Sequence, residues 1–372
     1  MVILRWAICG IVCSSQAGDL TVQPTLSPMP PTKESTLEAT ITDARGKPVT
    51  KANVVFDLSM PGMTMGEQRV KARSQGDGRY TAQGNFSMSG TWSIQVRVVH
   101  GGKRKLAEFT VEAKSPCTLA FHSNREGGIG IYLIKEDGSG LRKLTDGPMD
   151  NNPAFAPDGR MLTFDRDEDI YRIQVDGTGL QNLTRYEAAN ACSWWSGQGD
   201  QLAFQTNRDG HFEVYAMLPD GTGVSRLTRD TANNACPAFA RDARRIAFVS
   251  DRHGTMDLFT IGMDGTGERR LTAETGNNMD PAWSPDGSNL AFVSDREGRF
   301  EVYLTAHDGT NQRRLTQGAK SAVQPAFSPD GTRIAYERGG HLFIITTDGT
   351  GERQLTTGEA YHGGPSWDPR CR

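Results

Sequence analysis

The stretch SPDGSNLAFVSDREGRFEVYLTAHDGTNQRRLT, from Ser284 to Thr316, decides the fold because the chain repeats it. A similar stretch, SPDGTRIAYERGGHLFIITTDGTGERQLT, runs from Ser328 to Thr356. Each copy contains four short segments separated by Gly-containing turns. In this copy they are PAWS (281–284), NLAFVS (289–294), FEVYLT (300–305) and QRRLT. Asp-Gly steps between alternating apolar residues are strong signals of β-hairpins. Each copy therefore predicts four short strands.

The Leu-Thr ending of this stretch marks the period of the repeat. It occurs six times, with spacings of 39, 44, 44, 44 and 40 residues between successive leucines. A period of about 40–45 residues with four strands per unit is typical of a β-propeller. The sequence therefore predicts an all-β chain with a six-bladed propeller. The six leucines are Leu144, Leu183, Leu227, Leu271, Leu315 and Leu355.

The two ends of the repeated region complement each other. The first unit begins at CTLAFHS (117–123), which matches a second strand, and the chain ends in GGPSWDPRCR, which matches a first strand. The C-terminal strand is therefore expected to complete the first blade and close the ring, leaving few exposed edges. Closure brings Cys371 near Cys117. We predict a disulfide between them that stabilises the fold by a few kcal/mol.

The repeated pattern PAWSPDG…LAFVSDR.G…EVY….DGT..RRLT resembles the TolB-like family of WD40-like propellers. The resemblance covers about residues 117–372, and the propeller domain is expected to span residues 115–372. What it implies about function is the binding of other envelope proteins by a non-catalytic scaffold. A propeller fold by itself does not determine a function.

The segment in front of the repeats, residues 18–114, has short β-like stretches broken by Gly and Pro, which suggest a small sandwich. Its patterns D.RGKPV..A.V.F.L.MPGM.M and MSGTWSIQVRV resemble the YtkA/FixH-like domain, an immunoglobulin-like module of bacterial envelope proteins. A true TolB carries a different amino-terminal domain. The resemblance therefore implies an envelope protein without implying the Tol-system role.

The first 17 residues have the layout of a secretory signal peptide. A cation at Arg5 precedes the apolar stretch WAICGIVC, and SSQA predicts cleavage after Ala17. Acylation of Cys13, which would give a lipid anchor, is the alternative. No apolar run reaches the roughly 18–20 residues of a transmembrane helix, and the net charge of −3 gives no argument for nucleic acid. We expect a monomeric periplasmic or secreted bacterial protein.

One column of the repeat is polar and varied, at the residue just before each first strand. First strands line the channel of a propeller, so this column is expected to surround one mouth and to contact a partner, or to form a solvated rim. Trp194 joins it because it replaces a small residue of the repeat. For Cys192 and Cys236, in adjacent blades, a disulfide and two free thiols both remain open. The column reads Asn152, Cys192, Cys236, Asp280, Gln324 and Gly364.

Three further groups have structural readings that we favour over functional ones. An arginine recurs at equivalent turns, which indicates an architectural charge; its copies are Arg125, Arg166, Arg208, Arg252, Arg296 and Arg338. The acidic stretch DRDED (165–169) could hold calcium through oxygen ligands, but a solvated turn is favoured. Met60, Met63 and Met65 are weak candidates for Cu(I), and core methionines are favoured there.

Catalytic motifs find little support in the sequence. The chain has no Gly-x-Ser-x-Gly elbow, no His-Glu-x-x-His and no phosphate-binding loop, and its seven histidines are scattered. We therefore predict a non-catalytic envelope protein-binding scaffold without a cofactor, which uses the channel mouth. The alternatives are a propeller hydrolase or lyase that acts on a glycan or peptide, and copper or other metal handling through the Met-rich amino-terminal domain.

Overall fold

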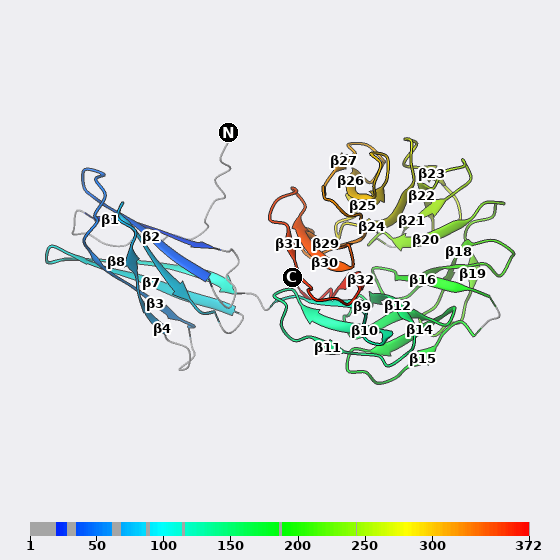
Figure 1. The fold of residues 1–372 in the computed structure, drawn as a ribbon, viewed down its shortest axis with the longest axis horizontal. Helices are drawn as coiled ribbons and strands as arrows, with labels where there is room; N and C mark the ends of the chain where they lie inside the picture. The colour runs from blue at the N-terminus through cyan, green and yellow to red at the C-terminus, as the bar shows by residue number, and fades with distance from the viewer. Residues whose placement is uncertain are drawn as a thin grey trace. The chain divides into compact units, whose positions relative to one another are not determined.

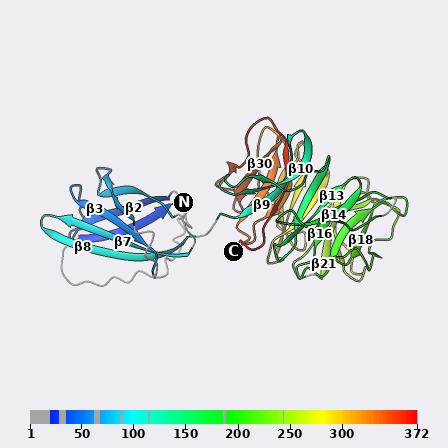
Figure 2. The same cartoon turned by 90° about the horizontal axis from the view of Figure 1, so that it is seen from below.

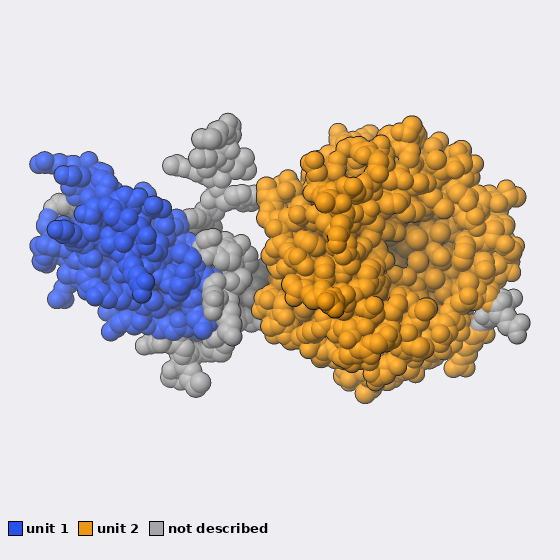
Figure 3. Space-filling view, viewed as in Figure 1, with its two compact units in different colours: residues 1–116 blue, residues 117–372 orange. Residues whose placement is uncertain are grey.

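The computed structural model describes residues 20–27, 35–61, 68–86, 90–113, 116–185, 188–242 and 244–371. Within these residues every regular element is a β-strand, and the strands form eight four-stranded antiparallel sheets. The all-β class is therefore confirmed. The chain divides into two compact units, residues 1–116 and 117–372 (Figure 3). The predicted signal peptide (1–17), Cys13, Met63 and Met65 lie outside the described residues.

Unit 1 consists of two sheets, with strand orders β1-β2-β6-β5 and β4-β3-β7-β8 (Figure 1). Buried and half-buried residues alternate along β2, so that one face of the strand supplies the core. Phe56 and Trp92, both fully buried, extend the same core from the second sheet. The strands are β1 Leu20–Ser27, β2 Ser35–Asp43, β3 Asn53–Ser59, β4 Gln68–Lys71, β5 Arg73–Ser74, β6 Arg79–Gly84, β7 Gly90–His100 and β8 Lys103–Ala113.

Unit 2 contains six four-stranded sheets within its described residues; five are simple meanders of consecutive strands, and the sixth has the order β11-β10-β9-β32. The innermost strands are β12 Asp150–Phe155, β16 Asn190–Trp195, β20 Asn234–Phe239, β24 Asn278–Trp283, β28 Ala322–Phe327 and β32 His362–Trp367. The second strands are β9 Thr118–Glu126, β13 Met161–Arg166, β17 Leu202–Thr206, β21 Arg245–Ser250, β25 Asn289–Ser294 and β29 Arg333–Arg338.

The outer half of each sheet in unit 2 has one long and one very short strand. The third strands are β10 Gly128–Lys135, β14 Asp169–Gln174, β18 Glu213–Met217, β22 Asp257–Gly262, β26 Glu301–Ala306 and β30 His341–Thr346. The outermost strands are β11 Arg142–Lys143, β15 Gln181–Asn182, β19 Ser225–Arg226, β23 Arg269–Arg270, β27 Arg313–Arg314 and β31 Arg353–Gln354.

The innermost strands of unit 2 surround a common centre. Each contacts the next along the chain, and β32 contacts both β28 and β12, which completes the circuit. The outermost strands lie at the periphery of the ring in Figure 1, and the view in Figure 2 shows the sheets side by side. Figure 3 shows unit 2 hollowed near its centre. This arrangement places equivalent residues of all six sheets around one axis.

The Leu-Thr and Asp-Gly motifs of the repeat have direct structural causes. The threonine hydroxyl accepts a hydrogen bond from the backbone N–H of the third strand, for example from Val214 to Thr228 at 2.9 Å. In the turn that follows the third strand, Gly221 has a φ of +87°, and a Cβ there would lie 2.4 Å from the carbonyl oxygen of Leu183. Only glycine fits this approach without strain. The threonine bond thus fastens the outer part of one sheet, and the glycine lets the turn approach the preceding sheet.

The sheet of β9, β10 and β11 receives its innermost strand from the far end of the chain. β32 pairs with β9 in antiparallel register, with Trp367 opposite Leu119. The indole N–H of Trp367 donates to the carbonyl oxygen of Ala326 at 3.0 Å, and the side chain is 5% exposed. The last strand therefore packs into the core between the first and last sheets of unit 2.

Candidate functional site

Each innermost strand of unit 2 contains one residue in the left-handed backbone region, and we call these six residues the mouth ring. The pairing register with the second strand shifts around this residue, as in a β-bulge. The sequence placed these residues just before the strands, whereas the bulge lets each strand continue past them. The ring is Asn152 (φ 50°), Cys192 (55°), Cys236 (48°), Asp280 (51°), Gln324 (53°) and Gly364 (57°).

The left-handed backbone of the mouth ring is strained at five of its six positions. A non-glycine residue pays roughly 1–2 kcal/mol for this conformation, and only Gly364 avoids that cost. Such strain persists where the surrounding structure fixes it, and it concentrates at functional sites. The bulge turns all six residues toward the same axial cavity, which has a volume of about 180 Å³ and is lined by the whole ring.

Side chains of the preceding sheet hold the backbone of the ring. Asp165 accepts the N–H of Cys192 at 3.0 Å, and Gln205 accepts the N–H of Cys236 at 2.8 Å. The equivalent residues on the next two sheets are Val249 and Val293, which have no acceptor. Beside Val293 the ring supplies the acceptor itself, because Asp280 accepts the N–H of Gln324 at 3.2 Å.

Side chains of the ring also bond directly to other ring residues, from Gln324 in β28 to Gly364 in β32 and Asn152 in β12. The side-chain carbonyl of Gln324 accepts the N–H of Gly364 at 2.8 Å, and its amide donates to Asn152 at 3.5 Å. Asn152 in turn donates to Asp165 at 2.8 Å. The predicted column residues are therefore brought together in one hydrogen-bonded network rather than standing separately on a solvated rim.

Asp165 corrects the interpretation of DRDED as a solvated turn. It lies at the end of β13, is 8% exposed and accepts hydrogen bonds from Cys192 and Asn152. The turn begins only at Asp167. Burial raises the pKa of Asp165 from 3.8 to about 7, although both hydrogen bonds oppose the rise.

The raised pKa of Asp165 predicts how stability depends on pH. The folded state holds this proton more tightly than the unfolded state, so the proton stabilises the fold fully below about pH 4 and this stabilisation is lost as the pH rises to about 7. Asp165→Asn should remove that loss, which amounts to about 4 kcal/mol in total and to about 2.5–3 kcal/mol between pH 5 and pH 8. Urea unfolding at pH 5 and pH 8 measures it, with Asp176→Asn at an exposed turn as the control. An equal change in the free energy of unfolding between pH 5 and pH 8 for both variants would contradict a raised pKa at Asp165.

Asp280 is the second carboxyl of the site. It is half-buried in the cavity wall, and burial raises its pKa, an effect that the N–H of Gln324 partly offsets. The lining of this cavity, within the part of the chain that the structure describes, includes no lysine, arginine or histidine. The described lining is therefore mainly apolar, with Asp280 as its one carboxyl group.

The four cysteines in the described residues are free thiols that form two contacting pairs. The side chains of Cys192 and Cys236 are hydrogen-bond partners within the ring. Cys117 and Cys371 are also side-chain partners, at the junction of β9 and β32. The predicted bond between Cys117 and Cys371 remains a prediction.

The sheet of β16 departs from the other five where it lines the cavity. Ser193 stands where they carry proline; it is 3% exposed, and its hydroxyl has no hydrogen-bond partner among the described residues. Trp194 follows it, half-buried against the core that contains Ala238, and also lines the cavity. The partly exposed ring of Trp194 gives this wall the means to contact a ligand, whereas the Ser193 hydroxyl is buried.

His122 belongs to the site, although the sequence gave no reason to select it. Its Nδ1 accepts the N–H of Asn152 at 3.4 Å, and its ring stacks on Tyr361 at 5.6 Å. Burial lowers its pKa to about 4, so the imidazole is neutral at pH 7 and can accept this bond. His122 and Tyr361 also line a neighbouring cavity of about 460 Å³, which extends the mouth beyond the ring.

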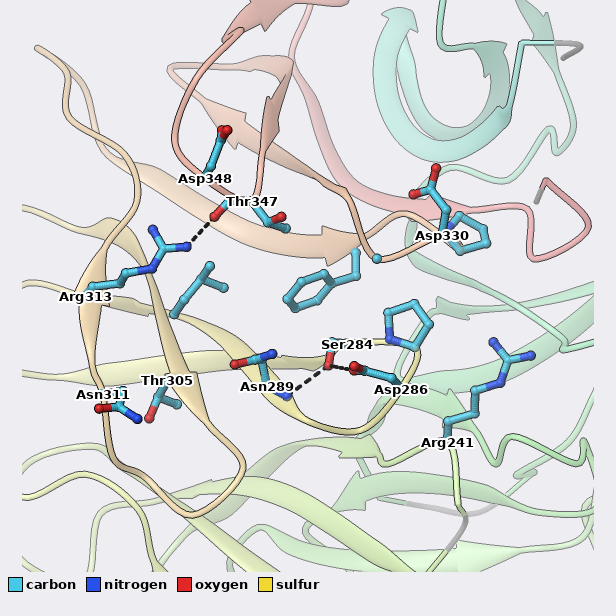
Figure 4. A pocket seen from close by; sticks show the side chains of 15 residues that line it. Arg241, Ser284, Asp286, Asn289, Thr305, Asn311, Arg313, Asp330, Thr347 and Asp348 are labelled. Atoms are coloured by element: carbon cyan, nitrogen blue, oxygen red, sulfur yellow. Dashed lines mark hydrogen bonds between the residues drawn. The ribbon is translucent and has the colours of Figure 1, made fainter. Parts of the chain in front are cut away.

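A larger cavity of about 870 Å³ lies among turns of the sheets that contain β24 and β28 (Figure 4). Its polar groups already bond within the turns: Ser284 donates to Asp286 at 2.6 Å and accepts the N–H of Asn289 at 2.9 Å. The same Ser–Asp bond recurs between Ser328 and Asp330. These contacts belong to the repeat, so this cavity is a weaker candidate than the mouth ring.

The recurrent arginines pack against the blades. Arg166 donates two hydrogen bonds to the buried Asp150, at 2.6 and 2.8 Å, and Arg252 lies 4.4 Å from the ring centroid of Phe259. No group of three or more His, Cys, Asp or Glu side chains suited to a metal ion occurs within the described ranges. Met60 is 8% exposed in the core of unit 1.

Comparisons with known proteins agree on the fold. The family model described as the TolB beta propeller domain matches residues 75–234, 178–274 and 230–372, and the model described as YtkA-like matches residues 14–97. The suspected resemblance to both families is thus confirmed. No helix in the described residues has the length and apolar character needed to cross a membrane.

Individual relatives are more distant. The Tol-Pal system protein TolB of Geobacter sulfurreducens is 34% identical over 79 residues, which are 20% of this chain and 18% of that protein. The chain therefore matches less than a fifth of this curated relative. The structure of TolB from Acinetobacter baumannii superposes with a TM-score of 0.64 at 18% identity, over 76% of this chain and 81% of that chain. A TolB structure from Agrobacterium tumefaciens gives a TM-score of 0.56 at 18% identity, over 68% and 99%.

Proposed function

Because the chain belongs to the family of TolB beta propeller domains, we propose that it is a non-catalytic binding protein of the bacterial envelope whose mouth ring docks another protein. The relatives named for the Tol-Pal system make an envelope protein the natural class of partner. We place the protein in the periplasm or outside the cell, as a monomer, after cleavage of residues 1–17 or anchored by a lipid at Cys13.

The proposal includes the domain architecture. The six sheets of unit 2 are the blades of a six-bladed propeller over residues 115–372, and the circuit of innermost strands supports its closure by β32. The two sheets of unit 1 form an immunoglobulin-like sandwich over residues 18–114. A disulfide between Cys117 and Cys371 fastens the closure, which their side-chain contact supports.

The mouth ring is the observation that carries the proposal. Six equivalent positions share one left-handed backbone conformation, which is strained at the five that are not glycine, yet their side chains differ from blade to blade. A structural role alone would favour the same residue, or glycine, at every copy. Variation in side chain on a fixed left-handed backbone is what a recognition surface requires.

Trp194 gives the proposed interface an aromatic anchor. Aromatic side chains dominate the energy of protein interfaces when they are buried by the partner. Trp194 lines the axial cavity and is half-buried in the free protein, so part of its ring remains available for contact.

Truncation of Trp194 should weaken binding strongly. We expect Trp194→Ala to reduce capture of the partner from crosslinked envelope extract at least tenfold, because a buried aromatic anchor contributes about 2 kcal/mol or more. Quantitative mass spectrometry of the captured proteins measures the loss. Leu218→Ala, at an exposed apolar residue of an outer turn, is the matched control and should retain full capture.

A double variant tests whether other side chains of the mouth ring also contribute to docking. Asp280→Ala combined with Gln324→Ala removes two ring side chains and should abolish capture of the same protein, provided that the thermal unfolding transition is retained. If all variants capture the same proteins as the parent chain, the mouth ring is not the docking site. If the parent captures no specific protein, the scaffold function itself is wrong.

A further inference from the structure

Two thiols occupy neighbouring positions of the mouth ring, and the repeat geometry brings them there. Cys192 lies in β16 and Cys236 in β20, at the same left-handed position of adjacent innermost strands. Their side chains lie close enough to interact, and both line the same cavity. Of the six ring positions, these two alone carry thiols, and they are adjacent.

The neighbouring sheets fix both cysteines in place. Asp165 holds the N–H of Cys192, and Gln205 holds the N–H of Cys236. Both backbones therefore have little freedom, and the contact between the thiols results from the fold rather than from a flexible side chain. Disulfide formation requires such proximity, with Cα atoms within about 7 Å.

The pair is accessible from the cavity. Both residues line it, and both are half-buried. Trp194 packs against the same apolar cluster as Cys236, so any link between the two cysteines lies in the wall that also carries the aromatic ring. A small reagent can therefore reach the thiols through the mouth.

The surroundings of the pair favour an uncharged form of sulfur. The contact with Cys236 and burial raise the pKa of the Cys192 thiol, and the nearby carboxyls of Asp165 and Asp280 add to the rise. A thiolate is therefore disfavoured here, whereas a disulfide has no ionisable group. A disulfide whose thiolate products are destabilised resists reduction.

From the position, contact and access of these thiols, we propose that Cys192 and Cys236 form a thiol–disulfide site in the wall of the channel mouth. Its oxidised form joins β16 to β20 covalently beside Trp194. The reaction partner is a small disulfide of the surrounding compartment, such as oxidised glutathione.

The exchange balances in two steps. The Cys236 thiolate attacks one sulfur of oxidised glutathione, breaks its S–S bond and releases one glutathione thiolate, which leaves a mixed disulfide. After loss of its proton to solvent, the Cys192 sulfur attacks the Cys236 sulfur of that mixed disulfide and releases the second glutathione thiolate. The two cysteines lose two electrons and two protons, and one oxidised glutathione becomes two reduced glutathione molecules.

Peptide mapping of the full chain tests the site. The reduced protein is incubated with oxidised glutathione, its remaining thiols are blocked, and it is digested with trypsin without reduction. We expect the peptide of residues 186–208 linked to that of residues 230–241. Recovery of both as separate blocked or glutathione-bearing peptides would overturn the proposal.

A variant of Asp280 tests whether the ring carboxyls raise the pKa of the Cys192 thiol. Asp280→Asn removes one nearby negative charge, lowers the pKa of the Cys192 thiol and should speed formation of the link several-fold at pH 7.5. Asp348→Asn, at an exposed turn, is the matched control and should leave the rate unchanged. Equal rates for both variants would show that the ring carboxyls do not govern the thiols, contrary to the proposal.

Discussion

A chain that ends at Ala360, without β32, is expected to lose the cooperative unfolding transition of unit 2. Burial of Trp367 alone contributes about 3–5 kcal/mol, and β32 also pairs with β9 and contacts β28 and β12. The total stability of a domain is only about 5–15 kcal/mol. Thermal melting followed by circular dichroism, with gel filtration for the hydrodynamic size, measures the effect.

The control for this truncation is a chain that ends at Asp368, which keeps β32 and removes only Cys371 and its three neighbours. It should fold and lose about 2–4 kcal/mol, the contribution of the proposed disulfide to Cys117. Reduction of the intact protein should cause the same loss. If the chain that ends at Ala360 melts within a few degrees of the full chain, the last strand does not close the structure.

Glu301→Ala is expected to destabilise unit 2 by about 3–5 kcal/mol. Glu301 is 1% exposed in β26 and accepts hydrogen bonds from Thr316 at 2.6 Å and from Arg338 at 3.3 Å. Arg338 lies in β29 of the next sheet and is itself 9% exposed. Removal of the carboxylate leaves a buried guanidinium that has lost this counter-charge, and weakens the contact between two sheets.

Urea unfolding gives the size of this effect, with Glu359→Ala at an exposed site as the matched control. Replacing both residues, Glu301→Ala with Arg338→Met, should cost less than the sum of the single changes, because each single change already removes the ion pair between them. Strict additivity, or a loss below 1 kcal/mol for Glu301→Ala, would show that this ion pair does not hold the sheets together.

The sequence predicts the fold well because the repeat records local interactions. The threonine of each Leu-Thr ending caps a strand of its own sheet, as Thr228 caps Val214, and each Asp-Gly turn needs its glycine. The threonine bond and the left-handed turn conformation of the glycine are local to one repeat, so they recur as letters at fixed spacing. Six copies of one local pattern were enough to indicate a propeller.

The details of the site could be predicted only in part, because they depend on contacts between sheets. From the sequence alone Asp165 is predicted to be solvated, because the N–H that it accepts belongs to Cys192 on the next sheet. His122 and Tyr361 are distant in sequence and meet only after β32 closes the ring. The left-handed backbone of the ring was also hidden, since five of its residues are not glycine.

A photo-crosslinking amino acid at position 194 tests the central claim most directly. With the probe in place of Trp194, irradiation in native envelope extract should give one dominant adduct with another protein, whereas the probe at position 218 should give none. This result would place the partner at the mouth ring. Absence of an adduct from position 194, or the same adducts from both positions, would contradict the account.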